Sequence, residues 1–344
     1  MKITLNKTVA ALTASIAMTS AAQAADVTLR FAHFWPAVSP IHKEVFQGWA
    51  DAVEADSNGR IEVEIYPGAT LSKPPAQYDA VINRIADMTA TVQGYTANRF
   101  PLTQVVELPG VVKTAEQGSC VIQSLYEEGL IAGEYKDTRP LFLFTHGQGH
   151  LHLKGKEVRE PADLAGLRIR RPTLVVGSML EGLEAQPVGM PAPNSYESMQ
   201  RGVINGVSLP WEGVNSFRIN ELADSHTEIG LYSLSFMGLS FMVTMNKSVY
   251  NSMPDDLKQV IDKHSGLELA KQSGKIFDQV DELGRAEAVE LGHTMITIEG
   301  GAENPAWKPV LDATTENYLQ ELEDKGMPAR NVYKRALELS EQCL

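Results

Sequence analysis

Three arginines lie close together in a short segment, and their spacing suits them to bind an anion. The segment reads DLAGLRIRRP at residues 163–172. A glycine turn before it and a proline at its end predict a strand over residues 167–170. On such a strand Arg168 and Arg170 point to one face and Arg171 to the other. A guanidinium that faces a cleft can bind a carboxylate through two parallel hydrogen bonds, whereas on a solvated strand it would be exposed.

Three histidines occupy a second polar segment, HGQGHLH at residues 146–152. In an extended chain His146, His150 and His152 point to the same side, and imidazole rings in such a set can bind zinc. The segment contains no Asp, Glu or Cys that would complete a metal site. The other interpretations are that the rings are packed or exposed, or that one donates a hydrogen bond to a bound anion. We predict neither a metal nor a cofactor.

Sequence motifs for catalysis are not found in the chain. It has no Gly-x-Ser-x-Gly elbow, no glycine-rich phosphate loop followed by Lys and Ser or Thr, and no His-Glu-x-x-His pair. An exported hydrolase or lyase on a similar fold is the alternative, which an assay for ligand turnover would test. The sequence favours a binding protein over an enzyme.

Strand-like and helix-like segments alternate along the chain. We predict strands at residues 27–34, 60–66, 87–92, 141–145, 167–170, 206–209, 236–245 and 294–298, and helices at 39–56, 75–85, 114–128 and 195–201. This alternation is typical of parallel sheets with crossover helices. Apolar residues then recur at helical spacing over residues 254–291, which predicts one helix of about 50 Å. Because one domain does not need that length, we expect the helix to pack under two domains.

The first residues have the features of an export signal. Lys2 and Lys7 precede an apolar run over residues 9–18, and Ala-Gln-Ala at 22–24 has the small-x-small pattern of a cleavage site. The apolar run is too short to span a membrane, which takes ~20 residues. We therefore predict a signal peptide at residues 1–24 and a mature protein in the periplasm.

The chain is acidic, which limits its partners. Its formal net charge is −13, and it becomes −15 once a signal segment with two lysines and no acidic residue is removed. Such a charge argues against nucleic acid and against an anionic membrane surface as partner. An anionic ligand must therefore be attracted by local cations. The remaining chain is long enough to build two domains with their own cores.

The chain has two cysteines, Cys120 and Cys343. In an exported protein an even count favours a disulfide, which here would tie the C-terminus to the helix that holds Cys120. The alternatives are two buried thiols, or one exposed thiol on a loose tail.

Several segments resemble the periplasmic binding proteins of tripartite ATP-independent periplasmic (TRAP) transporters. The resemblance to this C4-dicarboxylate-type family rests first on residues 164–172, which are similar to its D-L-x-G-x-K-I-R-x-P signature. Further similar segments follow in the family order and cover nearly all of the mature chain: residues 59–67, 107–109, 186–191, 194–206, 245–247 and 253–254. The combination is specific, although each motif alone is weak.

The resemblance implies a ligand site between two domains. Arg170 stands at the position of the family's carboxylate clamp, and His150 where many members carry a second basic residue. Leu209 replaces a frequent asparagine. These departures make a dicarboxylate ligand less expected than in the family at large.

Other candidate binding residues follow from matching positions at strand ends, where ligands of α/β sheets bind. They are Phe34 and Trp35 after the first strand, Gln93 and Tyr95 after the third, Trp211 and Glu212 after residues 206–209, and Lys73 on a loop. We expect Trp35, Tyr95 and Trp211 to enclose a flat or apolar ligand whose carboxylate Arg170 binds. The alternative is that two of these aromatic residues pack in the core.

The expected fold is α/β, a two-domain clamshell of the periplasmic-binding-protein type, with domain-crossing strands and a long helix that spans both domains. Domain I comprises residues 26–147 and 236–275, and domain II residues 148–235 and 276–344. The expected function is to capture a small organic acid and deliver it to TRAP membrane subunits as a monomer. An aromatic or ring-bearing monocarboxylate is expected first, and a short hydroxy or keto acid or a dicarboxylate second. An ATP-driven importer and a histidine-rich metal importer are the alternative roles.

Overall fold

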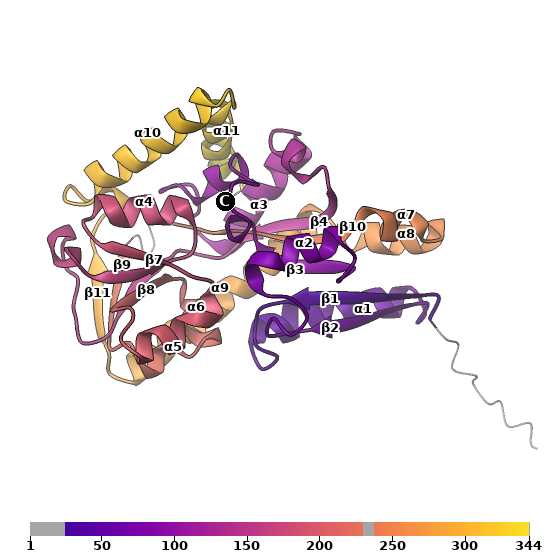
Figure 1. The fold of residues 1–344 in the computed structure, drawn as a ribbon, viewed down its shortest axis with the longest axis horizontal. Helices are drawn as coiled ribbons and strands as arrows, with labels where there is room; N and C mark the ends of the chain where they lie inside the picture. The colour runs from indigo at the N-terminus through magenta and orange to yellow at the C-terminus, as the bar shows by residue number, and fades with distance from the viewer. Residues whose placement is uncertain (1–24, 230–236, 344) are drawn as a thin grey trace, which may run out of the picture.

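Two β-sheets organise the protein in the computed structural model, which describes residues 25–229 and 237–343 (Figure 1). The predicted signal peptide lies outside these residues. The first sheet has the order β2-β1-β3-β10-β4 and the second the order β11-β9-β5-β8-β6-β7. The strands of the first sheet are β1 (Val27–His33), β2 (Ile61–Tyr66), β3 (Met88–Val92), β4 (Thr138–Thr145) and β10 (Ser240–Asn246). Those of the second are β5 (His150–Leu153), β6 (Arg168–Arg171), β7 (Gln186–Gly189), β8 (Gly206–Leu209), β9 (Ser225–Ile229) and β11 (Thr294–Ile298).

Both sheets are mixed, although crossover helices make most of their neighbouring pairs parallel. β1 is parallel to β2 and β3, and β6 is parallel to β7 and β8. The exceptions are β10 and β5, each of which is antiparallel to both of its neighbours. These are the strands that begin where the chain passes from one sheet to the other, between β4 and β5 and between β9 and β10. We call each sheet with the helices packed on it a lobe; the predicted domain boundaries remain a prediction.

Eleven α-helices cover the sheets in the described part of the chain. They are α1 (Gly48–Asp56), α2 (Gln77–Ile82), α3 (Ala115–Glu127), α4 (Leu174–Gly182), α5 (Ser195–Gln200), α6 (Trp211–Ser216), α7 (Lys247–Ser252), α8 (Asp255–Lys263), α9 (Leu267–Glu290), α10 (Lys308–Asp324) and α11 (Ala329–Gln342). A π-helical turn over Ile41–Gln47 leads into α1, so the predicted helix at residues 39–56 forms in two parts. The predicted helix at 114–128 forms as α3, and the Thr114 side chain caps it by accepting a hydrogen bond from the Gln117 amide.

The prediction of one helix over residues 254–291 is wrong. The chain forms α8 and α9, and Gly266 separates them with φ of 84°. The Gly266 amide donates to Leu141 O (2.8 Å), and the Trp49 indole donates to His264 O (2.9 Å). Because β4 and α1 take these backbone groups, the helical ladder is interrupted here, and a glycine accommodates the left-handed φ.

Helix α9 nevertheless joins the two lobes, as expected of the long helix. It packs on α3 of the first lobe and on α6 of the second. Asp278 accepts hydrogen bonds from the amides of Ala115 and Glu116 at the start of α3 (2.6 and 3.0 Å), and Asp281 accepts one from the Glu212 amide in α6 (2.5 Å). Burial raises the pKa of Asp278 to about 6 and that of Asp281 well above its usual value. One helix therefore caps a helix in each lobe.

The C-terminal helices lie on the outside of both lobes. α10 packs on α4 of the second lobe and α11 on α3 of the first (Figure 1). The predicted disulfide is confirmed: Cys120 in α3 bonds to Cys343 just after α11, with their Cα atoms 5.9 Å apart.

Candidate functional site

A small cavity of about 20 Å³ lies between the two lobes, with room for roughly one water molecule. Its walls come from the carboxyl ends of strands in both sheets, where ligands of α/β sheets bind. The lining residues are Phe34, Trp35, Val92, Tyr95, His146, Arg170, Ala192, Leu209, Pro210, Glu212, Gly213, Phe217, Leu239 and Phe241. Five of the nine predicted binding residues therefore lie together here: Phe34, Trp35, Tyr95, Arg170 and Glu212.

Arg170 presents a buried, positioned guanidinium to this cavity. A glycine turn at Gly166 (φ 73°) leads the chain into β6, and the side chain of Arg170 is fully buried. Its Nε donates to Met190 O (3.0 Å), Nη1 to Ser208 O (2.9 Å) and Nη2 to the Tyr95 hydroxyl (3.0 Å). A guanidinium has five N–H bonds, so these contacts leave two, one on each terminal nitrogen. Burial lowers the pKa of Arg170, but an arginine keeps its proton at any physiological pH.

The charge of Arg170 has no carboxylate partner among the described residues, since none of their acidic side chains forms an ion pair with it. A buried charge without a counter-ion is costly. An anion that accepts the two remaining N–H bonds would neutralise the charge.

Tyr95 adds a further donor beside this arginine. Its hydroxyl oxygen accepts from Arg170 Nη2 and from the Ala192 amide (2.9 Å). Both lone pairs are thereby used, so the hydroxyl proton is left to donate. Because Arg170 and Ala192 belong to the second lobe and Tyr95 to the first, these bonds also hold the lobes together.

Aromatic rings form much of the remaining wall. Phe34 stacks on Trp35 with ring centroids 3.9 Å apart, and lies 5.7 Å from Tyr95 and 6.3 Å from Phe217. Trp35 in turn lies 5.5 Å from Phe241. Such rings pack favourably on a flat apolar ligand.

Glu212 is the acidic residue of the lining. Its Oε1 accepts hydrogen bonds from the Trp35 indole (3.0 Å) and the Ser216 hydroxyl (2.7 Å). Burial raises the pKa of Glu212 to about 7, so its carboxyl group titrates near neutrality.

The other four predicted binding residues do not line the cavity. Gln93 is buried and donates to the Tyr135 hydroxyl (2.8 Å) and to Phe241 O (3.2 Å). Lys73 is exposed at the surface. His150 and Trp211 are buried in the second lobe, with ring centroids 6.2 Å apart.

Trp211 is held there by polar contacts as well as by packing. Its indole donates to Glu228 Oε1 (3.0 Å), and its ring lies 4.8 Å from His152. Its place in the cavity wall is taken by Phe217 and Phe241. Phe241 could have been found from the two-residue period of its strand, but no local pattern marks Phe217, which follows the end of α6.

The described residues contain no group of three or more His, Cys, Asp or Glu side chains that could hold a metal ion. The three histidines at residues 146–152 do not form one cluster. His146 lines the cavity as a neutral ring, because burial lowers its pKa to about 4. His152 instead pairs with His226, with the two Nδ1 atoms 2.8 Å apart.

A second buried carboxyl group holds the lobes together behind the cavity. Glu107 of the first lobe accepts hydrogen bonds from the hydroxyls of Thr173 and Ser240 (both 2.8 Å). Thr173 begins α4 in the second lobe, where its side chain also accepts from the Val176 amide. Burial raises the pKa of Glu107 to about 7. The predicted binding residues did not include this group.

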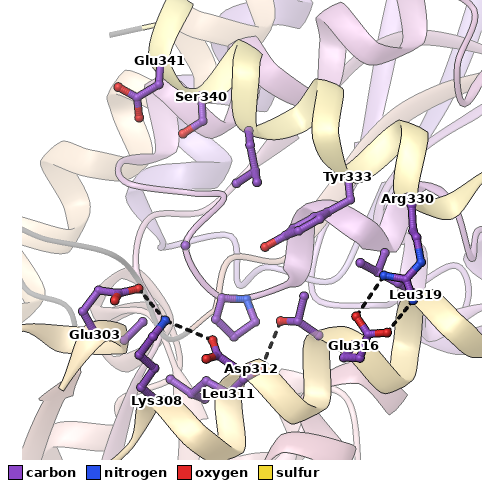
Figure 2. A pocket seen from close by; sticks show the side chains of 15 residues that line it. Glu303, Lys308, Leu311, Asp312, Glu316, Leu319, Arg330, Tyr333, Ser340 and Glu341 are labelled. Atoms are coloured by element: carbon purple, nitrogen blue, oxygen red, sulfur yellow. Dashed lines mark hydrogen bonds and ion pairs between the residues drawn. The ribbon is translucent and has the colours of Figure 1, made fainter. Parts of the chain in front are cut away.

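A larger hollow lies away from the cleft, between α10 and α11 (Figure 2). Its volume is about 550 Å³. Its two cations are already paired with acidic side chains: Lys308 with Glu303 and Asp312, and Arg330 with Glu316. A groove whose cations are paired in this way offers no binding group comparable to Arg170.

Comparison with known proteins agrees with this architecture. Residues 31–325 match the family model of the bacterial extracellular solute-binding proteins, family 7. The chain belongs to this family. The resemblance to TRAP binding proteins is thus confirmed, and the family's members are transport proteins rather than enzymes.

TRAP solute-binding proteins with known structures share the fold over nearly the whole chain. A TRAP solute-binding protein from Rhodoferax ferrireducens, in complex with copurified benzoate, is 34% identical with a TM-score of 0.88, and the alignment covers 92% of this chain and 98% of that one. A marine metagenome protein specific for aromatic acids, crystallised with 3-hydroxybenzoate, is 35% identical with a TM-score of 0.88 and coverage of 93% and 99%. A solute-binding protein of Albidiferax ferrireducens is 26% identical over 319 residues, which are 86% of this chain and 90% of the relative.

The family 7 proteins are extracytoplasmic, and within residues 25–229 and 237–343 no helix combines the length and the apolar character that a membrane crossing requires.

Proposed function

We propose that this protein captures a small aromatic monocarboxylate between its lobes and delivers it to TRAP membrane subunits. The observation that carries the proposal is the fully buried guanidinium of Arg170, which faces the cavity without a carboxylate partner among the described residues. A ligand carboxylate would accept its two remaining N–H bonds and the proton of the Tyr95 hydroxyl. Charge-assisted bonds of this kind strengthen when water is excluded.

The rest of the lining suits an aromatic ring better than a second charge. Phe34, Trp35 and Phe217 offer ring faces, and the ligands of the two similar solved proteins are benzoate and 3-hydroxybenzoate. A dicarboxylate would need another cation, but the other basic side chain of the lining is the neutral His146. The acidic Glu212 would also oppose a second negative charge.

Ligand entry requires the cavity to enlarge, because an aromatic ring needs more room than one water molecule. The lobes contact each other through hydrogen bonds from Arg170 to Tyr95 and from Trp35 to Glu212. We propose that these lobes separate to admit the ligand and return to the arrangement seen here around it. The mature protein would act in the periplasm as a monomer, and its lobes would be what the membrane subunits recognise.

Arg170→Lys tests the assignment, with Arg168→Lys as the matched control. Arg168 lies on the same strand, outside the cavity lining, and donates to Gly202 O (2.9 Å). Lysine keeps the charge but loses the planar pair of donors. In titration calorimetry with benzoate we expect Arg170→Lys to bind about 10-fold to 100-fold more weakly than wild type, and Arg168→Lys to bind normally. Equal affinity of all three proteins would refute the assignment.

A further inference from the structure

One oxygen of Glu212 is not accounted for by the protein. The residue is 3% exposed and lines the cavity. Both of its hydrogen bonds, from Trp35 and Ser216, go to Oε1. Oε2 has no partner within the part of the chain that the structure describes. Oε2 is not among the described side-chain atoms that are both buried and unpaired, so it keeps accessible surface in a residue that lines the cavity and can accept a hydrogen bond from a ligand group.

Four contacts along the cavity wall separate Glu212 from Arg170. The contacts run in sequence around the wall: Arg170 bonds to the Tyr95 hydroxyl, Tyr95 lies against Phe34, Phe34 stacks on Trp35, and the Trp35 indole bonds to Glu212. No hydrogen bond or ion pair joins Arg170 to Glu212 directly among these described contacts. A ring whose carboxylate is bound at Arg170 would therefore direct its opposite edge toward Glu212.

Resting on the proposed function, we infer that Glu212 makes the protein selective for aromatic acids with a hydroxyl group on the ring edge away from the carboxylate. The phenolic O–H would donate to Oε2. The hydroxyl would replace the water that the cavity can hold, and no covalent step is involved.

A hydroxyl fits this position better than an ammonium group. An ammonium carries three N–H bonds or more, and Oε2 can satisfy only one or two of them. The neighbouring lining residues, Pro210, Gly213 and Phe217, contribute no acidic or amide side chain. A hydroxyl needs a single acceptor, so it leaves no buried donor unpaired.

The test is the affinity of wild-type protein for a matched series of ligands by titration calorimetry. The series is benzoate, 2-, 3- and 4-hydroxybenzoate, and 3- and 4-methylbenzoate, whose methyl groups have the size of a hydroxyl but cannot donate. We expect the 3- or the 4-hydroxy acid to bind at least about 10-fold more tightly than benzoate and than its methyl counterpart. The 2-hydroxy acid should gain nothing, because its hydroxyl lies at the Arg170 end.

Glu212→Leu should remove this preference, so that the ratio of the affinity for the hydroxy acid to the affinity for benzoate falls to about one. Glu107→Gln is the matched control: Glu107 is also a fully buried carboxyl group, but its two oxygens are both hydrogen-bonded and it does not line the cavity. Glu107→Gln should change the affinity for all the acids by the same factor, so that the ratio of the affinity for the hydroxy acid to that for benzoate stays as in wild type.

The outcomes separate this inference from the proposed function. If no aromatic acid binds wild type, the proposed function fails. If benzoate binds and Arg170→Lys weakens it, but hydroxy and methyl acids bind equally, only the hydroxyl selectivity is refuted. Because the ligand series is measured on wild type, that comparison stands even where Glu212→Leu does not fold.

Discussion

Gly94→Ala should weaken ligand binding although residue 94 does not line the cavity. Gly94 follows β3 in the first lobe and faces Thr173 at the start of α4 in the second. A Cβ on residue 94 would lie 2.3 Å from Thr173 Cγ2 and 2.8 Å from Gln104 Nε2. Both distances are shorter than real Cβ atoms tolerate, so the two lobes could not meet as they do here.

The added methyl group destabilises only the arrangement in which the two lobes are in contact. Overpacking a tight contact costs about 1–3 kcal/mol, and this cost is absent when the lobes are apart. If the ligand is held by the lobes in contact, its affinity should fall by about 5-fold to 150-fold. Titration calorimetry with an aromatic acid that binds wild type measures this.

Two further variants make the prediction specific. Gly133→Ala is the control, since a Cβ there would meet nothing within 4 Å. Adding Thr173→Ser to Gly94→Ala removes the obstructing methyl group but keeps the hydroxyl that bonds to Glu107 and caps α4, so much of the affinity should return. Wild-type affinity in Gly94→Ala, or a double variant no better than the single one, would refute the closure of these lobes around the ligand.

Three other predictions concern charge, stability and the aromatic wall. Because the pKa of Glu212 is raised to about 7 by burial, its carboxyl group is neutral below that pH and negative above it. Benzoate affinity should therefore fall as pH rises through 7 in wild type, relative to Glu212→Gln; parallel pH profiles would contradict this. Cys343→Ser, which breaks the bond to Cys120, should lower the midpoint of thermal unfolding by roughly 3–8 °C, since a disulfide contributes about 2–5 kcal/mol and unfolding entropy is about 2.1 cal/mol/K per residue. An unchanged midpoint would show that the bond adds no stability. Trp211→Phe should lower the free energy of unfolding, measured in urea, by about 1–3 kcal/mol, because Glu228 loses a buried donor. This variant should bind benzoate normally. Phe217→Leu should bind benzoate several-fold more weakly. Loss of binding in a folded Trp211→Phe protein would overturn the location of that ring.

Local sequence patterns were sufficient to predict the features that depend on interactions between residues close together in the sequence. The glycine turn at Gly166 and the proline after the segment predicted a strand that ends at Arg170, because both signals lie within a few residues, whereas the burial of Arg170 is seen only in the structure. Thr114 marked the start of α3 through its own hydrogen bond to the next turn. The resemblance to a family of binding proteins extended these local features to the architecture of the whole chain.

Long-range contacts decided the rest. Gly266 interrupts the long helix because Leu141 and Trp49, far away in sequence, take the backbone groups around it. The helical spacing of apolar residues cannot predict such long-range partners, since it reflects only which face of a helix is buried. Likewise, Trp211 comes soon after the end of β8, where a cavity-lining residue is expected, but Glu228 and the rings around it hold it in the core.

The composition of the binding cavity depends on how the two lobes meet. The sequence by itself determined that an arginine, aromatic residues and Glu212 stand at strand ends, where a site could form. Only the tertiary structure decided that Arg170 has no carboxylate partner in the described residues, and that one oxygen of Glu212 is left for a ligand. Arg170 and Glu212 both belong to the second lobe, and their partners Tyr95 and Trp35 belong to the first, so no single segment of the chain contains these contacts.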